Sequence, residues 1–218
     1  MSGMRDDLEI TPTLILRAYA AGVFPMADSA VAEEIFWVDP KKRGVLPLDK
    51  FHLSASLKKR ALKPDYEVRI NTAFPRVVAA CADRPETWIN AEINDHFCTL
   101  YRMGYAHSVE IWIHDNLVGG LYGIAMGGAF FGESMFSRQR DTSKLAMLAL
   151  VARLKAGGFK LLDTQFVTDH LISLGGVEIS RSEYHKRLEQ ALHEHGDFWK
   201  LDRRTSAYDL VQLITQTS

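Results

Sequence analysis

The feature that most constrains the fold is a block of three β-rich runs in the middle of the chain. The runs cover residues 108–113, 117–126 and 129–136, and the pairs Asp115-Asn116 and Gly127-Gly128 separate them. Pairs of this composition form the tight turns that join neighbouring antiparallel strands. The block therefore predicts a three-stranded antiparallel meander.

The first of these runs also has a clear period of two. Val109, Ile111 and Ile113 alternate with Ser108, Glu110 and Trp112. Side chains of a strand point alternately to its two faces, so this pattern predicts a strand with one buried face.

Signals for helices surround the meander. Thr11-Pro12 opens one helix that Gly22 closes, and the capping box Ser180-x-x-Glu183 opens another. Apolar periodicity predicts further helices over residues 51–62, 74–82, 91–103 and from 141 or 142 to 155. Strands are predicted at 66–70 and 161–167. This order predicts an α+β fold with a mostly antiparallel sheet. Residues 1–47 are expected to form a small N-terminal domain, and residues 48–218 a second domain.

Composition and charge exclude several classes of protein. No run approaches the ~20 apolar residues of a membrane span, and residues 1–10 do not read as a signal peptide, so we expect a cytoplasmic protein with no membrane contact. Cys81 and Cys98 lie too far apart for a C-x-x-C motif and are more often buried thiols than a metal or redox pair. The formal net charge is -1, so any nucleic acid must bind to a local basic patch. The oligomeric state expected is a monomer.

The order of elements resembles the GNAT-type acyltransferase superfamily. That superfamily binds coenzyme A through a glycine-containing loop at the start of the helix that follows the meander. The equivalent segment here, residues 137–144, contains no glycine. Coenzyme A is therefore a poor candidate, although an N-acyltransferase that uses acyl-coenzyme A stays the alternative function.

Several short motifs are similar to those of the leucyl/phenylalanyl-tRNA-protein transferase family, and they follow the order of that family. They are Ala20-Ala21-Gly22-Val23-Phe24-Pro25, Trp37-Val38-Asp39-Pro40, His52-Leu53-Ser54, Thr87-Trp88-Ile89, Gly104-Tyr105-Ala106-His107-Ser108-Val109-Glu110, Gly132-Glu133-Ser134-Met135-Phe136-Ser137-Arg138, Leu162-Asp163-Thr164-Gln165, Asp169-His170 and Ser173-Leu174-Gly175. The resemblance spans residues 19–184 and implies a GNAT-like domain whose acyl donor is Leu-tRNA or Phe-tRNA, with Met carried less well. It also implies acceptor proteins that begin with Arg or Lys and are then degraded through the N-end rule pathway. From the resemblance we expect no metal and no cofactor.

The resemblance assigns chemistry to three polar residues. Asp163 and Gln165 are two apart on a predicted strand, so their side chains share a face. Gln165 is expected to orient the attacking amine and Asp163 to help carry its proton away, while Glu133 is expected to bind the ammonium of the donor. Without the resemblance, Asp163 reads as a strand-end carboxylate bonded to backbone, and Glu133 as a surface ion pair.

The resemblance also implies a dry pocket for the donor side chain. The positions expected to bind substrate are Trp88, Leu121, Phe130, Leu150, Leu154, Met26 and Ser134. Trp88 is expected to stack on the terminal adenine. Leu150 and Leu154 are equally well explained as core residues. Met26 stands where many members of the family carry a tryptophan.

A basic cluster supplies the expected tRNA-binding patch. Its members are Lys58, Lys59, Arg60 and Lys63. A solvated helix face explains the cluster equally well. A second alternative function is a non-catalytic RNA-binding module that uses this patch, but carboxylates at Glu133 and Asp163 would repel phosphate unless they served chemistry.

Overall fold

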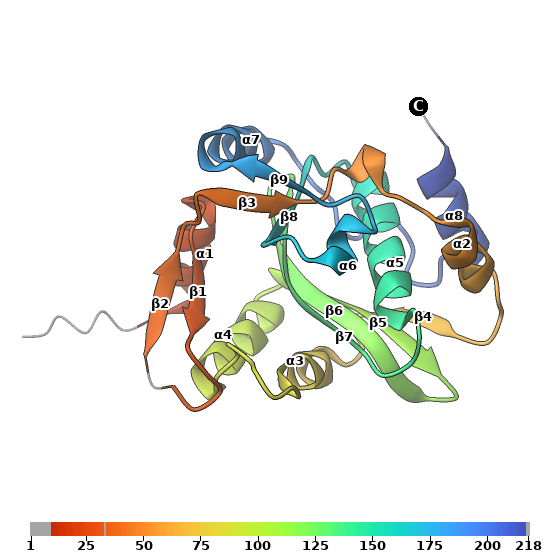
Figure 1. The fold of residues 1–218 in the computed structure, drawn as a ribbon, viewed down its shortest axis with the longest axis horizontal. Coiled ribbons are helices and arrows are strands. Elements are labelled where there is room, and N and C mark those ends of the chain that lie inside the picture. Colours follow the sequence, from red (N-terminus) through yellow and green to blue (C-terminus); the bar gives the residue numbers. More distant parts are fainter. Residues whose placement is uncertain (1–9, 33, 217–218) are drawn as a thin grey trace, which may run out of the picture.

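The computed structural model describes residues 10–32 and 34–216 as an α+β fold built around one large sheet (Figure 1). The strands are β1 (Phe24–Ala27), β2 (Ile35–Val38), β3 (Lys42–Val45), β4 (Glu67–Ile70), β5 (Ala106–Ile113), β6 (Asn116–Met126), β7 (Ala129–Ser137), β8 (Leu161–Gln165) and β9 (Val177–Ser180). The helices are α1 (Pro12–Ala20), the short 3-10 helix η1 (Leu48–Lys50), α2 (Ala55–Ala61), α3 (Phe74–Ala82), α4 (Ala91–Arg102), α5 (Thr142–Ala156), α6 (Asp169–Ile172), α7 (Arg181–His193) and α8 (Ala207–Thr215).

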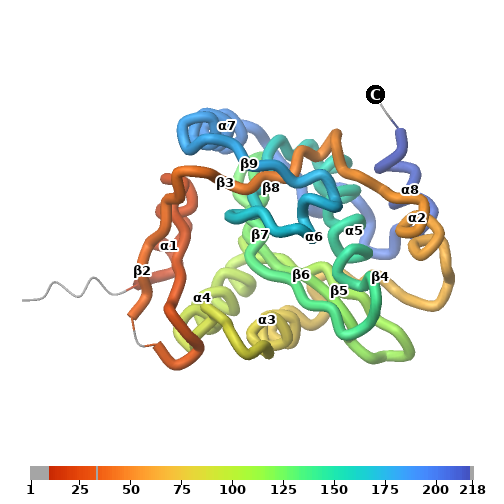
Figure 2. The backbone as a smooth tube through the Cα atoms, in the orientation of Figure 1, coloured from red at the N-terminus to blue at the C-terminus, as the bar shows by residue number. Residues whose placement is uncertain are grey.

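Seven strands form the large sheet in the order β4-β5-β6-β7-β8-β3-β9. The predicted meander is confirmed, because β5, β6 and β7 are consecutive antiparallel neighbours. The sheet is mixed, since β7 and β8 pair in parallel while the other neighbouring pairs are antiparallel. The tube in Figure 2 shows β3 beside β8 and β9, although more than a hundred residues separate them in sequence.

The prediction that β5 has a single buried face was wrong. Ser108 and Glu110 are fully buried, as is most of the strand. Helices α3 and α4 cover the polar-looking face, where Glu110 accepts hydrogen bonds from the backbone N–H groups of Thr72 and Ala73 at the start of α3. A buried carboxylate is stable there because several donors satisfy it.

Helix α5 packs on the opposite face of the sheet from α3 and α4 (Figure 1). Its sequence has no single apolar face, and the structure shows the reason. The sheet covers one side of the helix, and α2 and α8 contact other sides. Gly157 ends the helix as predicted. Asp141 stands at its N-cap with φ 66°, but its side chain makes no capping hydrogen bond.

The remaining helix predictions differ from the structure mainly at their ends. Thr11 caps α1, and α3 covers the predicted residues 74–82. The helix predicted at 51–62 is shorter, because the Ser54 hydroxyl accepts a hydrogen bond from Leu57 N–H and starts α2 there. The strand predicted at 161–167 ends at Gln165, where the backbone turns to φ 61°. Strands β1, β2, β3 and β9 and helices α6 and α8 were not predicted.

The N-terminal segment contributes to two sheets. Strands β1 and β2 form a two-stranded sheet of their own, whereas β3 inserts into the large sheet between β8 and β9. The division at residue 47 stays a prediction. Among residues 10–32 and 34–216, no helix is both long and apolar enough to cross a membrane.

Candidate active site

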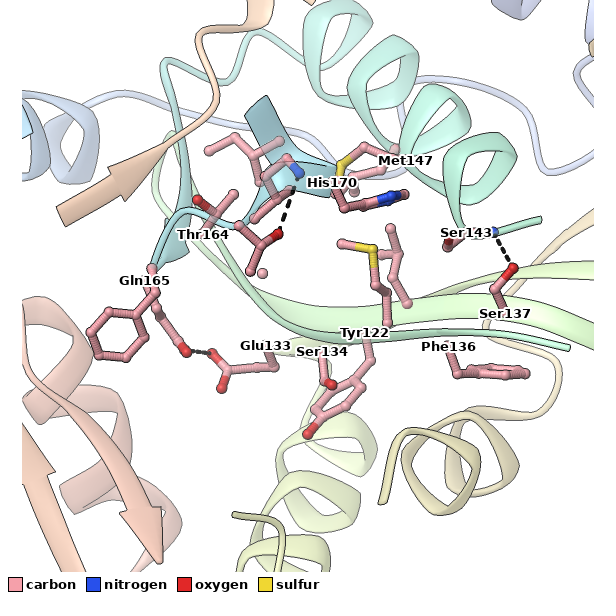
Figure 3. Close-up of a pocket in the computed structure, with 18 of the residues that line it drawn as sticks. Tyr122, Glu133, Ser134, Phe136, Ser137, Ser143, Met147, Thr164, Gln165 and His170 are labelled. Atoms are coloured by element: carbon pink, nitrogen blue, oxygen red, sulfur yellow. Dashed lines mark hydrogen bonds between the residues drawn. The ribbon is translucent and has the colours of Figure 1, made fainter. Parts of the chain in front are cut away.

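A cavity of about 380 Å³ opens where β7 and β8 diverge. Their parallel pairing ends at Phe131 and Asp163, and beyond that point α5 and the segment through α6 enclose the gap between them (Figure 3). Its lining combines apolar side chains with convergent polar groups, as ligand sites usually do. The lining residues are Arg84, Trp88, Leu121, Tyr122, Gly132, Glu133, Ser134, Met135, Phe136, Ser137, Ser143, Met147, Leu150, Leu162, Thr164, Gln165, Phe166, Thr168, His170 and Leu171.

Glu133 enters this cavity from a β-bulge. On β6, Gly123 pairs with Gly132 and Tyr122 pairs with Ser134, so Glu133 is the extra residue of β7. Bulges redirect side chains in this way beside active sites. Glu133 as a residue is 8% exposed, and its Oε1 accepts a hydrogen bond of 3.1 Å from Gln165 Nε2 (Figure 3).

The second oxygen of Glu133 is enclosed by the protein rather than exposed to the open cavity. Glu133 Oε2 and the hydroxyl of Tyr19 behind it are buried and have no hydrogen-bond partner among the described residues. Burial raises the pKa of Glu133 from 4.5 to about 8, and the nearby Tyr19 hydroxyl and Gln165 amide only partly oppose this rise. A cation placed at Oε2 would stabilise the ionised carboxylate and satisfy the free oxygen.

Gln165 faces Glu133 because of an unusual backbone turn at the end of β8. Its φ of 61° lies in the left-handed region, which a residue with a side chain rarely occupies. The backbone N–H of Gln165 donates a 2.8 Å hydrogen bond to Asp163 Oδ1, which stabilises this turn. Since Nε2 donates to Glu133, the carbonyl Oε1 of the same amide is directed away from Glu133 and is the acceptor that Gln165 presents.

Asp163 does not line the cavity. It is fully buried, and both of its oxygens are already bonded. Oδ1 accepts from Arg43 Nε at 2.9 Å as well as from Gln165 N, and Oδ2 accepts from Arg43 Nη2 at 2.6 Å and from the Tyr184 hydroxyl at 2.8 Å. The carboxylate therefore orients its neighbours and has no oxygen free to meet a substrate.

The apolar residues expected at the site divide into two groups. Leu121, Leu150 and the half-buried Trp88 line the cavity. Phe130 and Leu154 do not line it: Phe130 lies in the core and stacks on Phe198 with ring centroids 5.8 Å apart, and Leu154 is buried in the same core cluster. The side chains of Met135 and Met147, which the sequence reasoning missed, line the cavity.

Ser134 lines the cavity near its rim. Its hydroxyl accepts a hydrogen bond from the Arg84 guanidinium, which also donates to the carbonyl of Cys81 at 2.8 Å. Met26 is half-buried on β1 and is not part of the cavity lining.

The basic cluster lies on and just after α2, outside the cavity lining. Lys58, Lys59 and Lys63 are exposed. Arg60 is half-buried, forms an ion pair of 2.7 Å with Asp65 and lies over the ring of Tyr66. The role of this cluster in binding tRNA stays a prediction.

Further polar residues of the site were not singled out as functional from the sequence. Tyr122, Thr164 and His170 are among the lining residues, and the hydroxyls of the first two and the Nε2 atom of His170 are buried without a hydrogen-bond partner in the described part of the chain. The ring of Tyr122 points to the other side of the sheet, where it packs against Phe74 and Phe97. His170 was interpreted as structural, and its motif with Asp169 was the available signal. In residues 10–32 and 34–216, no three His, Cys, Asp or Glu side chains group as metal ligands.

Known proteins with similar sequences share one description. The family model of the leucyl/phenylalanyl-tRNA protein transferases matches residues 45–189, and the model of their N-terminal domain matches residues 9–41. The chain is 56% identical to a leucyl/phenylalanyl-tRNA-protein transferase of Ruegeria sp. (strain TM1040) over 97% of this chain and 100% of that protein. It is 51% identical to the protein of the same description from Cereibacter sphaeroides (strain KD131 / KCTC 12085), over 96% of this chain and 98% of that protein.

One solved structure of low sequence identity has a similar fold. The crystal structure of FemX aligns with a TM-score of 0.51 at 11% identity, over 81% of this chain and 70% of that one. The matches in sequence are far stronger, and they cover nearly the whole chain. The chain belongs to the leucyl/phenylalanyl-tRNA protein transferase family.

Proposed function

We propose that this enzyme transfers leucine or phenylalanine, and methionine less well, from aminoacyl-tRNA to the N-terminal α-amine of proteins that begin with Arg or Lys. The observation that carries the proposal is the cavity between β7 and β8, in which an apolar pocket ends at Glu133 and Gln165. The family membership supports the same reaction. The added residue would mark the acceptor protein for degradation through the N-end rule pathway.

The reaction is the aminolysis of an ester. The neutral amine of the acceptor attacks the aminoacyl carbonyl, the new C–N bond forms, the C–O bond to the ribose 3′-oxygen breaks, and a proton from the amine ends on that oxygen. The ester supplies the driving force, so the protein contributes orientation and electrostatic support.

The polar end of the cavity suits these tasks. The carboxylate of Glu133 holds the ammonium of the donor amino acid, which fixes the direction of its carbonyl. Gln165 Oε1 accepts a hydrogen bond from the attacking amine and orients its lone pair. Asp163 keeps the backbone of Gln165 in place; the proton reaches the ribose oxygen through the reacting groups or water, since both oxygens of Asp163 are already bonded.

The apolar part of the cavity would hold the donor side chain. Leu121, Met147 and Leu150 line it without charge, which favours leucine and phenylalanine over polar residues. An apolar pocket discriminates by only ~1–3 kcal/mol per methylene, so the selectivity is graded. The half-buried Trp88 offers a face to the terminal adenine, while the basic cluster on α2 contacts the body of the tRNA.

The finer assignments belong to the same proposal. Strands β4 to β9 would belong to a GNAT-like catalytic domain at residues 48–218, preceded by a small domain at 1–47 whose strand β3 joins the large sheet. The enzyme acts as a cytoplasmic monomer.

Transfer of radiolabelled leucine tests the proposal. Leucyl-tRNA is incubated with the enzyme and a peptide that begins with arginine, and the controls are a peptide that begins with glycine and a reaction with labelled acetyl-coenzyme A. The expected result is label on the arginine peptide alone. Acetylation without leucine transfer would move the protein to the class of enzymes that use coenzyme A.

A further inference from the structure

Arg43 is a buried charge that the proposed reaction does not use directly. The residue lies on β3 and is 1% exposed. Its Nε and Nη2 atoms donate to the two oxygens of Asp163, and Nη1 donates to the carbonyl of Gly22 at 3.0 Å. The guanidinium carbon lies 4.4 Å from the ring centroids of Phe24 and of Tyr184. Each of its three nitrogens therefore donates to a fixed acceptor, and the guanidinium contacts two aromatic rings.

Stability alone does not account for this arrangement. A buried ion pair contributes little net stability compared with a well-packed apolar pair, because both charges must leave water. What the pair does provide is geometry, since a planar guanidinium that binds both oxygens of a carboxylate fixes the orientation of that carboxylate. Asp163 is therefore held in one rotamer.

The orientation of Asp163 passes on to Gln165. Asp163 Oδ1 accepts from Arg43 Nε and from Gln165 N–H, and this second bond stabilises the left-handed backbone of Gln165. A non-glycine residue in that conformation costs about 1–2 kcal/mol, so it needs support from its surroundings. The side chain of Gln165 then reaches Glu133.

The neighbouring glycine shows how closely β3 supports the same turn. A Cβ atom at Gly44 would lie 2.7 Å from the carbonyl carbon of Phe166, the residue that follows Gln165. The backbone of β3 therefore packs directly against the turn. Through Gly22 and Phe24, Arg43 also ties this turn to the segment that follows α1.

We infer that Arg43 is a positioning residue for aminoacyl transfer, which acts through Asp163 to hold the amide of Gln165 against the attacking amine. The inference rests on the proposed function. It concerns the rate of the bound complex rather than the binding of either substrate, because Arg43 touches neither the cavity nor the basic cluster.

The test compares Arg43→Lys with the matched variant Arg153→Lys. Arg153 is also a buried arginine, 2% exposed, but it donates to the carbonyls of Phe198, Leu201 and Asp202, away from the cavity. Steady-state kinetics with leucyl-tRNA and an arginine peptide are measured at a temperature where circular dichroism shows each variant folded. Lysine keeps the charge but cannot bind both oxygens of Asp163 in the same way.

The expected result is that Arg43→Lys lowers kcat by roughly ten- to a hundred-fold, with KM for both substrates within about two-fold of the wild type. Arg153→Lys is expected to lose stability while keeping kcat within about two-fold. A folded Arg43→Lys enzyme with wild-type kcat overturns the inference. If the wild-type enzyme itself transfers no leucine, the proposed function fails instead.

Two further measurements separate positioning from general support of the fold. The first repeats Arg43→Lys in enzyme that already carries Gln165→Ala and measures the single-turnover rate of transfer with excess enzyme. Arg43→Lys should lower that rate by less than about two-fold, because its effect depends on the amide that Gln165→Ala has removed. Equal losses in both backgrounds overturn the inference. If Arg43→Lys does not fold, Phe24→Leu removes one ring that packs on the guanidinium; it should lower kcat several-fold at unchanged KM, and an unchanged kcat overturns the inference.

Discussion

Replacement of Glu133 by glutamine removes a carboxyl group whose pKa burial raises from 4.5 to about 8. The substitution keeps the shape of the side chain and an oxygen that accepts from Gln165 Nε2. It removes the ability to ionise and replaces the second oxygen with an NH₂ group. We therefore expect its effect on stability to depend on pH in a way that the structure defines.

The sign follows from the protons that each state binds. Between pH 4.5 and about 8 the folded chain keeps the proton on Glu133 while the unfolded chain has lost it, so a rise in pH favours unfolding. One proton corresponds to about 1.4 kcal/mol per pH unit, which gives a loss of up to about 5 kcal/mol across this range. Water that enters the cavity reduces this value, so it is an upper bound. Glu133→Gln escapes the loss.

Urea unfolding of both proteins between pH 4 and 9 measures the difference. The free energies of unfolding should agree near pH 4, and Glu133→Gln should become steadily the more stable protein up to pH 8, with a constant difference above it. Glu110→Gln is the control: this buried carboxylate accepts from several donors, among them the N–H groups of Thr72 and Ala73, so its loss should cost about 1–3 kcal/mol. A difference between Glu133→Gln and wild type that does not change with pH refutes the reasoning.

Three other substitutions have defined outcomes. Trp88→Ala should raise KM for leucyl-tRNA by about ten-fold with little change in kcat, because stacking on a base is worth about 1–3 kcal/mol; steady-state kinetics would show an unchanged KM if Trp88 does not meet the adenine. Removal of both Lys58 and Lys59 side chains by alanine should reduce the slope of log affinity for tRNA against log salt concentration by about two, and a titration with an unaltered slope would place the tRNA elsewhere. Leu150→Ala should shift the ratio of kcat/KM for phenylalanine over leucine about ten-fold in favour of phenylalanine, since it enlarges the cavity; an equal fall for both donors in competition assays would show that Leu150 serves packing alone.

Local signals account for the parts of the fold that the sequence predicted well. The meander was readable because its turns lie within a few residues of the strands they join. Signals for the start of a helix are present at α1 and α3, because proline stands in the first turn of each and Thr11 caps α1. Strands β3 and β9 have four residues each and were missed, because each pairs with a strand more than a hundred residues away along the chain.

Only those residues of the candidate site that lie in the family motifs could be predicted from the sequence. Glu133, Gln165 and Trp88 were placed by resemblance, and the structure brings them to one cavity. Leu121 and Leu154 look alike in sequence, yet only the fold decides that the first lines the cavity and the second lies in the core. Arg43 follows two lysines and reads as surface charge. Its burial depends on β3 entering the large sheet, which no local pattern showed.

The central claim is that transfer takes place where β7 and β8 diverge, with the amide of Gln165 at the attacking amine. The most direct measurement is the single-turnover rate of leucine transfer by Gln165→Ala at saturating leucyl-tRNA, together with its Kd for the same tRNA. The account predicts a rate at least roughly a hundred-fold below that of the wild type, with Kd within about two-fold. A wild-type rate of transfer in the Gln165→Ala enzyme would contradict it.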